Sequence, residues 1–123
     1  MNNDTIEPCK FCGQEVEYKP LEEMKQYGVA VYFCYKCLTE YIYWMNSNFG
    51  DYISVSIYAT HNNKMYRWTT TGTAAHLWYI KTPGIPGTRK NENLELLKTF
   101  NQDIPTITPD NFLEKLSVYL LFI

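Results

Sequence analysis

Four cysteines in two matching frames constrain this chain more than any other feature. The frames are CKFC at residues 9–12 and CYKC at residues 34–37. Two residues between paired cysteines allow a tight turn that aims both sulfurs at one point, and four thiolates complete the tetrahedron that Zn²⁺ accepts. Gly13 follows the first pair and supplies the positive φ that such a turn often requires. The predicted ligands of one metal ion are Cys9, Cys12, Cys34 and Cys37.

Other uses of paired cysteines are weaker alternatives. A disulfide framework needs an oxidising compartment, and the start MNNDTIEPCK lacks the basic and apolar regions of an export signal. A thioredoxin-like redox pair needs a single such frame at a helix start within a βαβ unit. Iron is an alternative to zinc as the bound metal, because iron–sulfur and rubredoxin-like sites use the same cysteine pairs. We expect zinc, in a structural role because thiolates fill every coordination position.

Residues 9–37 of this 123-residue chain resemble a zinc ribbon, in which two metal-binding knuckles are joined by strands. Cys9, Cys12, Cys34 and Cys37 match the four ligands of that family one for one. The resemblance implies the metal more than the function, because zinc ribbons occur in transcription factors, ribosomal proteins, polymerase subunits and protein-binding modules. The Asn-, Lys- and Tyr-rich remainder would suit a small phage-type accessory protein.

Hydrophobic periodicity predicts an α+β fold in which the ribbon precedes an antiparallel sheet. Strands are expected at residues 15–18, 29–33, 52–60, 65–71 and 74–81, where apolar and polar residues alternate or β-branched and aromatic residues gather. Residues 38–45 fit a strand or a helix, and their aromatic content favours the strand. Asn62 and Asn63 mark a hairpin turn, because Asn tolerates the left-handed region. Residues 52–81 should form a three-stranded meander.

Two helices are expected after the meander, packed on the sheet. Residues 92–100 place Leu94, Leu97 and Phe100 on one helical face. Thr108 is the predicted cap of a second helix that runs to about residue 121. The expected core face of that helix consists of Phe112, Leu113, Leu116, Tyr119 and Leu120. The chain then divides into a zinc-ribbon-like segment, residues 1–45, and a sheet with two helices, residues 46–123, within one compact unit.

Charge is unevenly distributed along the chain. The net charge of −2 argues against a generally basic nucleic-acid coat, yet residues 52–91 contain no Asp or Glu. Cations and aromatic rings interleave there, as on surfaces that stack nucleobases. The predicted partner-binding residues are Lys64, Arg67, Trp68, Lys81, Arg89 and Lys90. The same stretch could instead be core strands, which are commonly poor in acids and rich in rings.

Catalytic motifs are missing from the sequence. His61 and His76 are followed two places on by Asn63 and Trp78, so neither fits the His-x-Glu frame of a zinc deaminase. HExxH and phosphate-loop motifs are also absent. We therefore expect a non-catalytic zinc-binding interaction module, a small adaptor or inhibitor that binds a larger protein machine. The alternative is a zinc-ribbon nucleic-acid-binding protein that uses the basic, aromatic β-surface.

The sequence also predicts where in the cell the protein is found. Without an export signal or an apolar segment of transmembrane length, the chain is expected to be cytoplasmic and to make no membrane contact. The sequence does not determine the oligomeric state, since the apolar C-terminus could complete the core of one chain or form the interface of a dimer.

Overall fold

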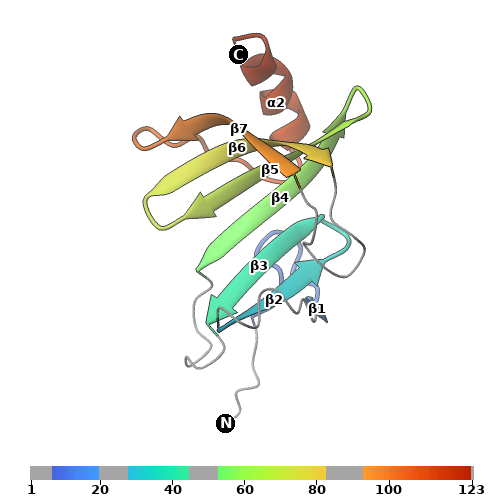
Figure 1. The fold of residues 1–123 in the computed structure, drawn as a ribbon. Coiled ribbons are helices and arrows are strands. Elements are labelled where there is room, and N and C mark those ends of the chain that lie inside the picture. The colour runs from blue at the N-terminus through green and yellow to red at the C-terminus, as the bar shows by residue number, and fades with distance from the viewer. Residues whose placement is uncertain (1–6, 20–27, 45–52, 83–92, 123) are drawn as a thin grey trace.

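The computed structural model describes residues 7–19, 28–44, 53–82 and 93–122. These residues form one seven-stranded antiparallel sheet, with the strands in sequence order, and one helix (Figure 1). The strands are β1 (Glu17–Lys19), β2 (Val29–Cys34), β3 (Thr39–Trp44), β4 (Ser54–His61), β5 (Lys64–Thr71), β6 (Ala74–Thr82) and β7 (Asn93–Phe100), and the helix is α2 (Phe112–Leu120). The meander predicted for residues 52–81 is confirmed as β4–β6, and it continues on both sides.

Local turn chemistry explains the central hairpins. His61 pairs with Lys64, and the two residues between them, Asn62 and Asn63, have φ values of 52° and 65°. This is the turn that the Asn pair predicts, because two successive positive φ angles match the twist of paired strands. The strand favoured for residues 38–45 is also confirmed as β3. It pairs with β4, so the predicted segments 1–45 and 46–123 share one sheet.

The helix predicted for residues 92–100 is wrong, because residues 93–100 form β7 and residue 92 lies outside the described residues. Strand β7 pairs with β6 from Phe100, opposite Ala75, to Asn93, opposite Thr82. The register shifts between Leu77 and Trp78, and Leu97 falls at that irregularity. A bulge inserts one residue, so side chains three apart can lie on one face of a strand. Leu97 and Phe100 both pack on the core, and their spacing therefore imitates a helical repeat.

Helix α2 begins four residues after the predicted cap. Residues 109–111 form a turn, in which the Asn111 N–H donates to Thr108 Oγ1 (3.2 Å) and the Thr108 N–H donates to Asn111 Oδ1 (2.8 Å). This reciprocal pair resembles a capping box, with Asn replacing the usual Glu or Gln. Phe112 and Leu116 are buried, and Tyr119 and Leu120 pack beside them. Leu113 is 48% exposed, so its predicted place in the core face is wrong.

One face of the sheet holds two hydrophobic clusters. The larger surrounds Trp68 and Leu77 on β5 and β6 and includes α2, while the smaller contains Tyr41, Tyr43, Val55 and two cysteines. Phe11 packs against both clusters and so connects them. The cysteines and α2 consequently lie over the same face of the sheet. Within the described residues, no helix has the length and apolar character that crossing a bilayer requires.

Candidate metal centre

The first knuckle, residues 9–13, is a loop that closes on itself before β1. The Gly13 N–H donates to the Cys9 carbonyl (2.8 Å), and the Cys9 N–H donates to the Gln14 carbonyl (2.9 Å). Gly13 has a φ of 78°, a conformation that most residues with a Cβ avoid. The positive φ predicted for Gly13 is therefore confirmed, and the Gly13 N–H closes the loop onto the Cys9 carbonyl.

The second knuckle, residues 34–38, is the turn of the β2–β3 hairpin. Cys34 ends β2 and pairs with Thr39, the first residue of β3. Leu38 holds the position that Gly13 holds in the first knuckle, and its φ is also positive, at 53°. The Leu38 carbonyl accepts a 3.0 Å hydrogen bond from the Tyr58 N–H of β4. The strand ladder on both sides thus holds a leucine in a conformation that glycine adopts more readily.

The four sulfur atoms converge at one point between the knuckles. All four Sγ atoms lie within 4.8 Å of one another, and Cys12 Sγ is 3.6 Å from Cys34 Sγ. That separation is far longer than a disulfide bond, and all four cysteines are free thiols. Cys9 and Cys34 are buried, while Cys12 and Cys37 are partly accessible. The four cysteines could hold one metal ion, as the spacing predicts.

Hydrogen bonds to the sulfurs prepare the site for thiolates. The Tyr41 hydroxyl donates to Cys9 Sγ (3.2 Å), and the Gln14 N–H donates to Cys12 Sγ (3.5 Å). Burial raises the pKa of Cys9, but the hydrogen bonds from Tyr41 and from the amides of Phe11 and Cys12 outweigh it and lower the pKa from 9.0 to about 7. Burial raises the pKa of Cys34 and, more strongly, that of Cys37. Cys9 therefore loses its proton more readily than Cys34 or Cys37.

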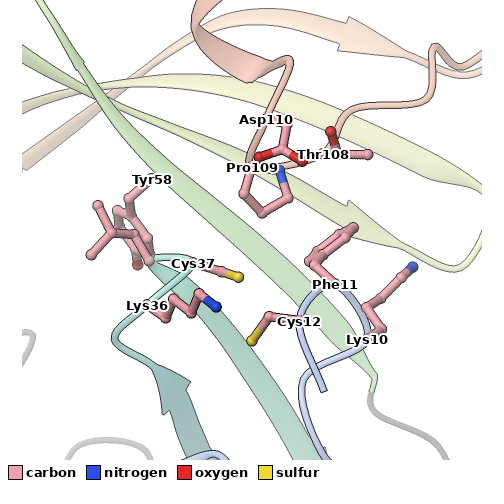
Figure 2. A pocket seen from close by; sticks show the side chains of 10 residues that line it. Lys10, Phe11, Cys12, Lys36, Cys37, Tyr58, Thr108, Pro109 and Asp110 are labelled. Carbon is pink, nitrogen blue, oxygen red and sulfur yellow. The ribbon is translucent and has the colours of Figure 1, made fainter. Parts of the chain in front are cut away.

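A cleft of about 680 Å³ opens beside the metal centre, between the knuckles and the turn that precedes α2 (Figure 2). Lys10 and Phe11 border it from the first knuckle, and Lys36 and Leu38 from the second. Thr108, Pro109 and Asp110 line its opposite side, and Tyr58 from β4 borders it beside the second knuckle. The cleft thus combines rings and other apolar surface with two cations and one carboxylate. Its shape depends on the knuckles, since both lysines lie inside the CxxC frames.

The four predicted partner-binding residues that the structure describes do not form one surface. Trp68 is 1% exposed and lies in the core, whereas its neighbour Arg67 points to the other face of the sheet and is 8% exposed. The Arg67 guanidinium lies 5.1 Å from the centre of the Tyr58 ring. Lys64 is exposed near the β4–β5 turn, and Lys81 forms a 3.4 Å ion pair with Glu95. Arg89 and Lys90 lie outside the described residues.

Sequence reasoning missed the residues that surround the metal centre. The sequence assigns no role to Tyr41, which is one aromatic residue in a predicted strand, or to Phe11, which lies between two cysteines. A signal existed for Tyr41, because alternation along β3 places it on the face that Cys34 shares. Nothing local indicated that Thr108 and Asp110 would line a cleft with the knuckles, since that arrangement depends on the packing of α2.

Fold and site together define a sheet-rich protein with four cysteines placed to hold a metal ion. No protein-family model, no curated protein and no solved structure matches the chain. Its function must therefore be argued from its own residues.

Proposed function

We propose that this chain is a non-catalytic zinc-binding interaction module, a small adaptor or inhibitor that binds a larger protein through the cleft beside the metal centre. The observation that carries the proposal is the mixed lining of that cleft. Phe11 and Pro109 offer rigid apolar surface, of the kind that anchors peptide segments at protein interfaces. Lys36 and Asp110 offer charges of both signs at its borders.

Zinc is supported by the sulfur geometry and by the donor set. Zinc–sulfur bonds of about 2.3 Å in a tetrahedron place neighbouring sulfurs about 3.8 Å apart. The 3.6 Å between Cys12 and Cys34 is close to that separation. When bound, zinc would link the two knuckles and leave no coordination position for water or substrate, which supports a structural role. Because iron accepts the same four thiolates, elemental analysis of the purified protein distinguishes the two metals.

A protein partner is favoured over nucleic acid by the charges around the cleft. Lys10 and Lys36 line the same cleft as Asp110 and lie next to thiolates that remain net negative around a divalent ion. A phosphate backbone requires cations that the neighbouring groups do not offset. Exposed apolar side chains near the end of α2, Leu121 at 78% and Phe122 at 82%, also suit protein contact better than nucleic-acid contact.

The test compares two exposed lysines, of which one borders the cleft and the other does not. Lys36→Glu reverses a charge at the border of the cleft, and Lys64→Glu makes the same change near the β4–β5 turn. Proteins captured from a lysate of the source cells by the wild type should be retained by Lys64→Glu and lost from Lys36→Glu. Fluorescence anisotropy with single- and double-stranded oligonucleotides should show no binding even at low salt. Oligonucleotide binding that weakens steeply with salt and is lost in Lys64→Glu would support the nucleic-acid alternative instead.

A further inference from the structure

A buried hydroxyl connects the first knuckle to the sheet. Tyr41 lies in the middle of β3 and is 2% exposed. Its hydroxyl donates to Cys9 Sγ at 3.2 Å and accepts from the Lys10 N–H at 3.0 Å. A phenolic hydroxyl has one hydrogen and free lone pairs, so both bonds can form at once. One oxygen atom therefore contacts both the ligand sulfur and the backbone of the same knuckle.

We propose that Tyr41 is the positioning residue of the metal centre: it orients Cys9 toward the metal ion and fastens the first knuckle to the sheet. The knuckle's own hydrogen bonds, from Gly13 to Cys9 and from Cys9 to Gln14, close the loop but do not attach it to a strand. The bonds of Tyr41 cross more than thirty positions of sequence, from β3 to the loop. This role is separate from whatever the cleft binds.

The hydrogen bond also changes the electronic character of Cys9. A donor aimed at a thiolate withdraws negative charge from the sulfur, so the sulfur gives less charge to the metal. The bond therefore makes the ligand-to-metal charge-transfer transition of a cobalt-substituted protein higher in energy. It also holds the side chain of Cys9 in one orientation before the metal binds, which favours binding. Both consequences can be measured without knowing any partner.

The experiment compares Tyr41→Phe with Tyr43→Phe in the full chain. Both tyrosines lie on β3, point to the same face, belong to the same cluster and are almost fully buried. Each change removes one buried hydroxyl, but within the described residues the hydroxyl of Tyr41, and not that of Tyr43, donates to a ligand sulfur. Zinc affinity is measured by competition with a chromophoric chelator, and the charge-transfer bands are measured with Co²⁺.

Tyr41→Phe should weaken zinc affinity roughly 10- to 100-fold, as loss of an outer hydrogen bond to a ligand typically does. Its Co²⁺ charge-transfer bands should move to lower energy, while Tyr43→Phe keeps the wild-type affinity and spectrum. Equal affinity and spectra in wild type and Tyr41→Phe would overturn the proposal. Equal losses in both variants would overturn it too, because the loss of any buried hydroxyl from this cluster would then explain the effect.

A measurement on the wild type covers the case in which Tyr41→Phe does not fold. With ¹¹³Cd²⁺ in the site, the Tyr41 hydroxyl proton should exchange slowly with water and show scalar coupling to the metal through the sulfur of Cys9. A rapidly exchanging hydroxyl with no coupling would contradict the proposed hydrogen bond. The proposed hydrogen bond can thus be tested without any substitution.

Discussion

The two knuckles have the same cysteine spacing but are supported in different ways. The second is the turn of a hairpin, so the ladder between β2 and β3 holds Cys34 and Cys37 at a fixed separation. The first lies before β1 and is held by side chains, through the Tyr41 hydroxyl and the Phe11 ring. One motif can therefore be preorganised either by backbone pairing or by tertiary contacts. We expect the tertiary contacts that support the first knuckle to be weaker, when the metal is absent, than the backbone pairing that supports the second.

The largest expected effect follows from removing one ligand in each knuckle. Cys9→Ser and Cys34→Ser should both lose the metal ion, because four thiolates are needed to complete the tetrahedron. Structural zinc contributes on the order of 10 kcal/mol of apparent binding free energy in small domains, so the loss should lower thermal stability steeply. Metal content is measured by elemental analysis. A variant with one full equivalent of metal would contradict the four-cysteine assignment.

Hydrogen exchange of the same variants separates the two knuckles. In Cys9→Ser, amides of the first knuckle should exchange quickly while those of β2 and β3 stay protected by their strand ladder. Amides of β4–β7 should stay protected in both variants, since their core around Trp68 contains no ligand. Equal loss of protection in β2 and in the first knuckle of Cys9→Ser would contradict the proposed difference in support.

The pH dependence of the metal-free protein should show opposite signs for the two knuckles. The pKa of Cys9 is lowered from 9.0 to about 7, so between these values the unfolded chain binds more protons and stability should rise with pH. The pKa of Cys37 is raised, so above about pH 9 the folded protein retains a proton that the unfolded chain has lost, and stability should fall. Urea unfolding midpoints of the reduced, metal-free protein from pH 7 to 10 measure this. Midpoints that do not change between pH 7 and 9 would argue against the lowered pKa of Cys9.

The smallest expected effect concerns the residue after each second cysteine. Gly13→Ala should cost about 1 kcal/mol, because a Cβ disfavours its φ of 78° while meeting no atom within 4 Å. Leu38→Gly should stabilise the metal-loaded protein by roughly 0.5 kcal/mol, since relief of the left-handed strain slightly exceeds the added flexibility of the unfolded chain. Denaturant unfolding of the metal-loaded protein gives both values. If Leu38→Gly instead destabilises by as much as Gly13→Ala, contacts of the leucine side chain outweigh its backbone strain.

Prediction from sequence succeeded where short-range chemistry determines the structure. The two CxxC frames identified four cysteines that the structure brings within 4.8 Å of one another, and the Asn62–Asn63 pair identified a hairpin turn, because the spacing of neighbouring residues indicates both. It failed at β7, where an irregularity in the strand placed Leu97 and Phe100 on one face and so imitated the helical repeat. It could not place Trp68 in the core and Arg67 on the opposite face, because alternation does not say which face is covered.

The sequence by itself determined that four thiols could share a metal ion and that most of the chain favours strands. Both follow from local spacing and from side-chain type. Only the tertiary structure decided that Tyr41 would reach Cys9, and that the turn at Thr108 would face the knuckles across a cleft. Those contacts join residues far apart in the chain, and they exist because the sheet and α2 bury a shared apolar face. These long-range contacts are selected by the free energy of burying apolar surface over the whole sheet, which cannot be read from a short segment of sequence.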